Sequence, residues 1–197
     1  AFNTHNYTPH LLCPNLNHIL GFRGAFGSEE ERVLQEAIRY YRDNQTDPPY
    51  EGEYETQFCS GFVEFMGGGY ADAVASGTIS CYIAIAALNL PQGSDVLISP
   101  VTDSGPLNAI IMRGLIPVLM DSAPNSYNID IATFLERVTP NTSAVFLVHS
   151  AGEPVDTEEI VKEAHNRGIR VIEDCSQAPG AVVCKNSSNS CDRSCNV

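Results

Sequence analysis

Two polar residues stand where a predicted strand ends and could hold a ligand there. Asp174 and Gln177 follow the apolar residues 171–172, so a carboxylate and an amide lie just beyond the strand. A carboxylate on a largely apolar sheet needs a cationic or hydrogen-bond-donating partner, for example a protonated pyridine nitrogen. The amide of Gln177 could donate to a neighbouring phenolate oxygen. The residues alone leave another interpretation open, in which Asp174 caps a helix or pairs with an arginine.

A second motif, Ser76-Gly77-Thr78, stands directly before an apolar helical stretch. Gly77 lets a ligand approach the backbone closely, and Thr78 supplies a hydroxyl group. The first N–H groups of a helix have no acceptor within the helix and lie at its positive end, so the motif could bind an anion. An ordinary helix N-cap explains the same residues equally well.

These motifs are positioned by an alternation of short apolar runs and helical stretches that begins at residue 70. The apolar runs predict strands at 71–75, 95–99, 116–120, 144–148 and 170–173, with helices between them at 79–90, 105–113, 130–138 and 156–167. The alternation indicates an α/β fold with a mostly parallel sheet covered by helices on both faces. Ligands of such folds bind at the carboxyl ends of the strands, where both motifs lie.

Two amphipathic helices precede this region. The first is predicted to begin at Ser28, with Glu31 completing a capping box, and its apolar residues recur at helical spacing up to residue 41. We expect that apolar face to pack inward. The second helix carries Phe58, Phe62 and Phe65 on one side and is followed by three glycines. No Gly-Lys-Ser/Thr follows those glycines, so they do not form a Walker loop.

The composition is that of a globular chain, with 43% hydrophobic and 18% charged residues among 197. We expect an irregular arm over residues 1–27, a domain over 28–183 and a polar, cysteine-containing tail over 184–197. With 24 acidic and 11 basic residues, the net charge is −13. This charge argues against nucleic acid as a partner, because phosphate binding rests on Lys and Arg. The apolar stretches fall short of the roughly 20 residues that span a membrane.

The chain contains seven cysteines, which is an odd number. Four stand singly in apolar or helical contexts: Cys13, Cys59, Cys81 and Cys175. The other three lie in the tail: Cys184, Cys191 and Cys195. These three lack a fourth cysteine or a suitably spaced histidine for zinc. We therefore expect reduced cysteines, no metal site and a cytoplasmic protein without a signal peptide.

Six short motifs follow one another in a specific order. They are Ser76-Gly77-Thr78, Asp95-Val96-Leu97-Ile98, Ile116-Pro117-Val118, Asn128-Ile129-Asp130, Val148-His149 with Gly152 and Pro154, and Ile172-Glu173-Asp174 with Gln177. Their order and spacing resemble the N-terminal half of the DegT/DnrJ/StrS-type sugar aminotransferases, a pyridoxal-phosphate (PLP) family. The resemblance covers about residues 28–183. It implies the large domain of a fold-type I PLP enzyme, with the aspartate aminotransferase fold and without its C-terminal part.

The resemblance also implies roles for individual residues. Gly77 and Thr78 match the family's phosphate-contacting turn. Asp174 matches the carboxylate that holds the pyridinium nitrogen, which makes the ring an electron sink, and Gln177 matches the residue beside the cofactor's ring oxygen. His149 matches a family histidine near a Tyr-Gly, but Ser150-Ala151-Gly152 follows it here. We interpret His149 as a structural residue.

The chain departs from the family pattern at two places. Where the family stacks an aromatic residue on the cofactor, this chain has Asp103, which could contact a polar group of the cofactor or substrate, or cap the next helix together with Ser104. The family's Schiff-base lysine lies on a later strand. Lys185 lacks the motif that flanks that lysine and is not assigned to the role. We therefore predict no catalytic residue within this sequence.

The resemblance implies PLP-dependent transfer of an amino group from an amino acid, glutamate or glutamine, to a nucleotide-linked keto sugar. It also implies a homodimer whose catalytic lysine lies outside this sequence. Two alternatives stay open: a non-catalytic truncated homologue or partner subunit, and a PLP-dependent sugar dehydratase. A generic nucleotide-binding α/β domain is disfavoured, because no Gly-x-Gly-x-x-Gly follows the first predicted strand.

Overall fold

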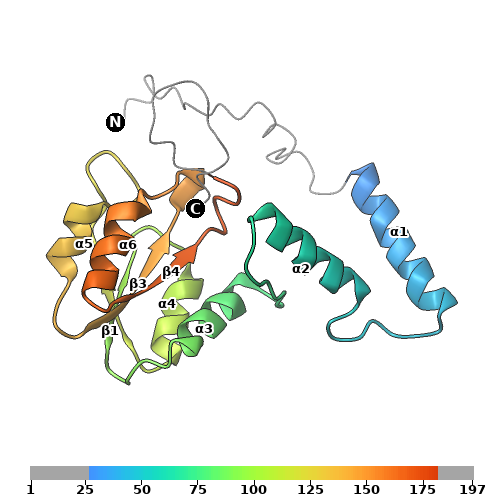
Figure 1. Cartoon of the computed structure of the whole chain (residues 1–197), viewed down its shortest axis with the longest axis horizontal. Helices are drawn as coiled ribbons and strands as arrows, with labels where there is room; N and C mark the ends of the chain where they lie inside the picture. Colours follow the sequence, from blue (N-terminus) through green and yellow to red (C-terminus); the bar gives the residue numbers. More distant parts are fainter. Residues whose placement is uncertain (1–26, 182–197) are drawn as a thin grey trace. The chain divides into compact units, whose positions relative to one another are not determined.

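The computed structural model describes residues 27–181, which fall into two compact units divided between Phe58 and Cys59. The first unit contains helix α1 (Ser28–Asp43) and the start of helix α2 (Glu53–Phe65) (Figure 1). The second unit contains the rest of α2 and the predicted α/β domain. The predicted arm, apart from Gly27, and the cysteine-containing tail lie outside the described range.

The second unit is built on a parallel sheet of four strands. In chain order these are β1 (Asp95–Ile98), β2 (Ile116–Leu119), β3 (Thr142–Val148) and β4 (Arg170–Asp174). Their order in space is β2-β1-β3-β4, and every pairing is parallel. The chain therefore moves outward from β1 to β2 and then crosses back to place β3 on the other side of β1. The carboxyl edge at such a reversal is the usual ligand site of an α/β sheet.

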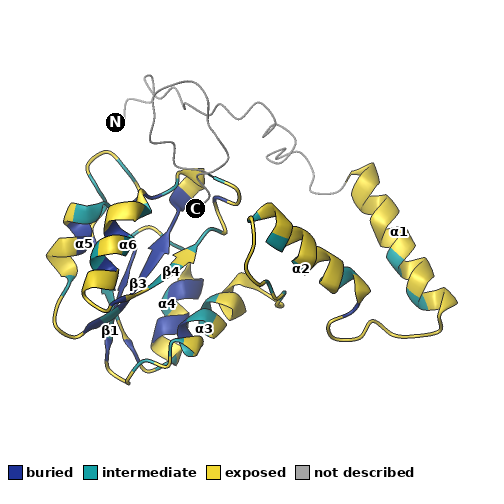
Figure 2. Ribbon diagram, in the orientation of Figure 1, coloured by how far each residue is buried: buried dark blue, intermediate teal, exposed yellow. Residues whose placement is uncertain are grey.

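Helices cover both faces of the sheet, which confirms the predicted α/β fold. Helices α3 (Gly77–Ala87) and α4 (Ser104–Met112) pack on one face, and α5 (Ile131–Arg137) and α6 (Thr157–Asn166) on the other (Figure 1). Because side chains alternate along a strand, Phe146 of β3 joins the α3 and α4 side, whereas its neighbours Val145 and Leu147 join the α5 and α6 side. Figure 2 shows the central strands as the buried layer.

One predicted strand is wrong. Residues 71–75 pair with none of the strands that the structure describes, and their backbone leads directly into α3. A strand requires a neighbour that completes its hydrogen bonds, and Val74 remains 39% exposed. The other predicted strands and helices of this unit are confirmed within a few residues at their ends. The short 3₁₀ turn η2 (Ser150–Gly152) was not predicted.

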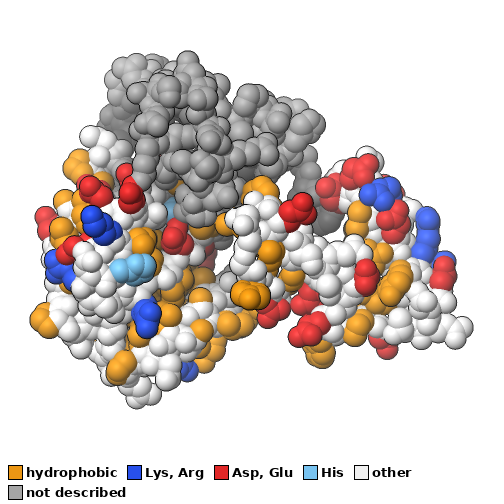
Figure 3. Space-filling model, in the orientation of Figure 1, with side chains coloured by type: hydrophobic (Ala, Val, Ile, Leu, Met, Phe, Trp, Pro, Cys, Tyr) orange, Lys and Arg blue, Asp and Glu red, His pale blue; other side chains and the backbone are white. Residues whose placement is uncertain are grey.

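Helix α1 begins at Ser28 as predicted, but its cap lies one residue earlier. Gly27 is the N-cap, and its N–H donates to Glu30 Oε2 at 2.7 Å, so the predicted pairing of Ser28 with Glu31 is wrong. The expected inward packing is also wrong for the described residues, since α1 has no buried residue and Ile38 is 63% exposed. Apolar and acidic side chains lie next to one another on the surface of this helix (Figure 3). None of the described helices is long and apolar enough to cross a membrane.

Candidate active site at the carboxyl edge of the sheet

Asp174 is the last residue of β4, and its carboxylate is held from two directions. Oδ1 accepts the N–H of Ser176 at 3.0 Å, and Oδ2 lies 3.9 Å from the Sγ atom of Cys81 on α3. Its backbone carbonyl accepts the N–H of His149 at 3.1 Å, which joins the ends of β3 and β4. Within residues 27–181, Asp174 neither caps a helix nor pairs with an arginine. A half-buried carboxylate oxygen with only a weak S–H donor can still accept a stronger hydrogen bond.

Cys81 is a contact of Asp174 that the sequence analysis missed. Its burial and the nearby negative charge of Asp174 raise the pKa of the Cys81 thiol to about 11. The thiol is therefore protonated at neutral pH and can donate to the carboxylate. Its position three residues after Thr78 on a helix was the available signal, because residues at that spacing share a face.

The predicted anion motif forms the first turn of α3. Ser76 is the N-cap, and its Oγ accepts the N–H of Ile79 at 3.3 Å. Gly77 is exposed, and a Cβ atom at this position would meet nothing within 4 Å, so the backbone is open to a ligand. The start of α4 lies beside this turn, because a Cβ atom at Gly105 would lie 3.1 Å from Thr78 Oγ1. The N-terminal ends of α3 and α4 thus meet at one place.

Asp103 is positioned as a helix cap. It is the N-cap of α4, and its Oδ1 accepts the N–H of Gly105 at 2.8 Å. Its side chain therefore satisfies one of the unpaired N–H groups of the helix. Of the two roles that the sequence allowed for Asp103, the cap is the one for which the structure provides a partner.

Gln177 lies in the turn after β4, and its Oε1 accepts the backbone N–H of Ala151 at 2.8 Å. Ala151 belongs to η2, the turn that follows β3. The predicted residues Asp174 and Gln177 are thus both tied to the turn after β3, Asp174 through its backbone and Gln177 through its side chain.

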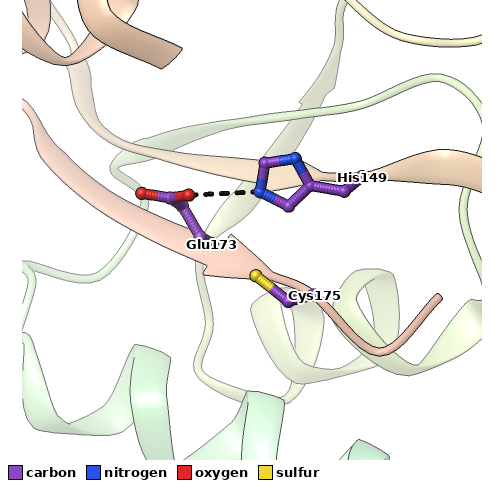
Figure 4. A group of neighbouring side chains, drawn as sticks. All are labelled: His149, Glu173 and Cys175. Carbon is purple, nitrogen blue, oxygen red and sulfur yellow. Dashed lines mark hydrogen bonds and ion pairs between the residues drawn. The ribbon is translucent and has the colours of Figure 1, made fainter. Parts of the chain in front are cut away.

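His149 lies between β3 and β4 beside Glu173 and Cys175 (Figure 4). Its ring is 1% exposed, its Nδ1 accepts the N–H of Val155 at 2.9 Å, and its Nε2 lies 3.1 Å from Glu173 Oε2. Both ring nitrogens therefore have partners within the protein, which agrees with the structural interpretation of this residue.

The three side chains are of types that bind zinc, and their ligand atoms lie within 4.8 Å of one another. Burial opposes a charge on the ring, whereas the neighbouring Cys175 and Glu173 favour one. A second proton would have to occupy Nδ1, where the N–H of Val155 already donates. We therefore assign a neutral ring with its proton on Nε2, facing Glu173. A metal would need a lone pair on that same nitrogen, so the group is better suited to hydrogen bonding than to metal binding.

A separate open groove lies in the first unit and has a volume of about 600 Å³. Its lining comes from α1 and the turn after it: Leu34, Ala37, Ile38, Tyr41, Arg42, Gln45, Thr46, Asp47 and Pro48. It contains none of the predicted site residues. The chemistry of the sheet edge, rather than the size of a groove, therefore identifies the candidate site.

Comparisons with known proteins agree with this geometry. The sequence model of the DegT/DnrJ/EryC1/StrS aminotransferase family matches residues 28–191. Protein MosB of Rhizobium meliloti is 40% identical over 119 residues, which are 60% of this chain and 24% of MosB. GDP-perosamine synthase of Escherichia coli O157:H7 is 33% identical over 131 residues, which are 66% of this chain and 36% of that enzyme.

Solved structures share the fold of this chain. The E. coli GDP-4-keto-6-deoxy-D-mannose-3-dehydratase with bound hydrated PLP has a TM-score of 0.69 and 26% sequence identity. The match covers 86% of this chain and 42% of the dehydratase. The chain thus spans well under half the length of the relatives that it matches.

Proposed function

Since the chain belongs to the DegT/DnrJ/EryC1/StrS aminotransferase family, we propose that its α/β unit is the PLP-binding part of an enzyme of amino-sugar biosynthesis. The observation that carries the proposal is the half-buried Asp174 carboxylate at the end of β4, whose Oδ2 has only the weak S–H donor of Cys81 within residues 27–181. A protonated pyridine nitrogen is the kind of donor that this carboxylate could still accept.

The residues present fit such a cofactor. Asp174 would hold the pyridinium nitrogen, and Gln177 would donate its amide N–H to the ring oxygen. Gly77 and Thr78, at the open first turn of α3, would contact the phosphate. When bound, PLP supplies an electron sink for chemistry at the carbon next to the amino group. A contact between Asp103 and the cofactor stays a prediction beside its role as a cap.

The protein groups act by holding charge and protons in place. The negative charge of Asp174 favours the protonated form of a ring nitrogen, while Ser176 and Cys81 fix the orientation of the carboxylate. The positive end of α3 favours a dianionic phosphate. The lysine within the described range, Lys162, is exposed on α6, and Lys185 lies outside that range. We infer that the catalytic lysine comes from outside residues 27–181, on the same chain or on a partner.

The reaction that we propose transfers an amino group from an amino acid to a nucleotide-linked keto sugar, in the cytoplasm and by a homodimer. A sugar dehydratase is a second candidate, because a solved dehydratase shares the fold over 86% of this chain. Mass spectrometry of the product made by the protein at its natural length separates the two. An aminotransferase product gains an amino group and keeps its hydroxyl groups, whereas a dehydratase product has lost a hydroxyl group.

A non-catalytic homologue is the remaining alternative, and the intact mass of the protein from its natural source tests it. A mass near the 21.3 kDa of this chain would favour a non-catalytic or partner subunit. A mass about twice as large would favour a complete enzyme that contains this unit.

Cofactor binding is tested with pyridoxamine phosphate, which lacks the aldehyde that would react with lysines. The chain contains no tryptophan, so the fluorescence of the ligand can be followed directly. We expect saturable binding that Asp174→Asn weakens about thirtyfold, since hydrogen bonds to charged groups contribute about 2 kcal/mol. Asp95→Asn, at the opposite edge of the sheet, is the matched control and should leave binding unchanged. Absence of saturable binding, or equal weakening by both variants, would contradict the proposal.

A further inference from the structure

The turn after β3 contains a backbone conformation that is unusual for its residue type. Ala151 has a φ of +57°, in the left-handed region that a side chain disfavours, and Gly152 follows with a φ of +82°. In this conformation the N–H of Ala151 donates to Gln177 Oε1 at 2.8 Å. A non-glycine residue persists in this region when the surrounding structure determines its conformation.

Three hydrogen bonds hold the turn in place. The backbone N–H of Ser150 donates to Asn128 Oδ1 at 2.9 Å, and the Ser150 hydroxyl donates to the carbonyl of Val101 at 2.8 Å. Asn128 Nδ2 in turn donates to the carbonyl of Glu153 at 2.7 Å. Asn128 is 3% exposed and Ser150 is 1% exposed, so both residues that make these bonds are themselves buried. The turn therefore presents the Ala151 N–H in a fixed direction.

The chemistry of this contact settles which end of the Gln177 amide faces the turn. A backbone N–H can only donate, so the Gln177 atom that it meets must be the oxygen. The NH₂ group of the same amide is then the end left to meet a ligand, and it can only donate. A ligand at this position must present an acceptor atom.

We propose that Ala151 is a positioning residue that holds the Gln177 amide as a donor toward the ligand. This inference rests on the proposed function for the identity of the ligand, which is the ring oxygen of PLP or pyridoxamine phosphate. The contact between Ala151 and Gln177 can be measured without any ligand. The experiments can therefore contradict the contact and the identity of the ligand independently of one another.

The first experiment measures amide hydrogen exchange at Ala151 by NMR in the ligand-free protein. Gln177→Ala removes the acceptor and should speed exchange at Ala151 several-fold. Gln177→Glu keeps an acceptor oxygen, so exchange should stay close to that of the unaltered protein. Equal exchange in all three proteins would overturn the proposed contact, whatever the ligand.

The second experiment is a double-mutant cycle for binding of pyridoxamine phosphate. Ala151→Pro removes the N–H and, because proline cannot adopt a positive φ, also displaces the turn. If the turn acts through Gln177, this variant should weaken binding about fivefold in the unaltered chain, but less than twofold when Gln177 is already alanine. Ala151→Gly keeps the N–H, tolerates the positive φ and should bind as the unaltered chain does. Gln177→Glu should bind more weakly than Gln177→Ala, because a carboxylate repels an anionic ring oxygen.

Two results separate failure of the positioning role from failure of the proposed function. A loss from Ala151→Pro that is equally large in both backgrounds would show that the turn acts independently of Gln177, and would overturn the positioning role. Normal exchange behaviour at Ala151 together with no binding of pyridoxamine phosphate would instead contradict the proposed cofactor and leave the contact standing.

Discussion

The loops after β1 and after β4 each carry an aspartate at the carboxyl edge of the sheet, but they use it differently. In the loop after β1, the exposed Asp103 directly precedes helix α4, and its carboxylate accepts the N–H of Gly105 in the first turn of that helix. After β4, no helix begins within the described range, and Asp174 binds only the N–H of Ser176 and the Cys81 thiol. An aspartate beyond a strand end can thus accept a hydrogen bond from a ligand when its carboxylate does not cap a helix.

The two loops also differ in how they are anchored. The end of β4 is tied to β3 through buried His149, whose backbone and ring both contact neighbouring segments. The loop after β1 has one such tie, from the Ser150 hydroxyl to the Val101 carbonyl, but its Thr102 hydroxyl is buried without a hydrogen-bond partner among the described residues. We therefore expect the loop after β4 to be the more rigid of the two.

The largest effect should come from His149→Ala, which removes the anchor of the loop after β4. The change leaves a cavity and deprives the Val155 N–H and the Glu173 carboxylate of a partner, so we expect a loss of about 3 kcal/mol in the free energy of unfolding. Urea unfolding followed by circular dichroism measures this value. His165→Ala, at an exposed position on α6, is the control and should cost less than about 1 kcal/mol. If His149→Ala lowers the free energy of unfolding no more than His165→Ala does, then His149 does not anchor the loop after β4.

The alkylation rate of the Cys81 thiol should depend on the negative charge of the Asp174 carboxylate beside it. With a pKa of about 11, it should react with iodoacetamide at pH 8 about tenfold to a hundredfold more slowly than an ordinary thiol. The rate should rise with pH until the pH passes about 11. Asp174→Asn should speed the reaction, because it removes the negative charge that opposes the thiolate. Peptide mapping by mass spectrometry follows the labelling, and an unchanged rate in Asp174→Asn would show that the carboxylate does not act on the thiol.

Asp103→Ala should have a smaller effect, and on stability rather than on binding. Loss of the α4 cap should cost about 1 kcal/mol, which lowers the melting temperature by about 2–4 °C for a chain of this length. Asp103→Ser supplies another capping side chain and should restore most of that loss. Binding of pyridoxamine phosphate should change less than threefold. A larger loss of binding would show that Asp103 contacts the cofactor in addition to capping α4.

The difference between the two loops also marks how far the sequence could predict this site. Runs of buried residues such as β3 identify strands, because burial on both faces requires continuous apolar sequence. The segment 71–75 is also mostly apolar, but whether it forms a strand depends on a neighbour that local sequence does not specify. Likewise, both aspartates could be placed at strand ends, but the partner of each is decided by the segment that lies next to it in space.

The contacts of His149 and Ala151 show the same limit over longer separations. Val148 lies beside Asp174 because β3 and β4 pair in parallel at one register, and this register brings His149 to Glu173. No spacing along the chain encodes that pairing. The left-handed conformation of Ala151 was also invisible in the sequence, since alanine disfavours it and only the surrounding hydrogen bonds determine it.

Thr102→Val tests the loop after β1 with the smallest change. The buried hydroxyl has no partner among the described residues, so its replacement by an isosteric methyl group should leave the free energy of unfolding unchanged or raise it by about 0.5 kcal/mol. Urea unfolding provides the measurement, with Thr133→Val as the control. Thr133 caps α5 through two hydrogen bonds with Asp130 and should lose about 1 kcal/mol. A loss at Thr102 as large as that at Thr133 would mean that its hydroxyl has a bound partner, and that the loop after β1 is anchored as firmly as the loop after β4.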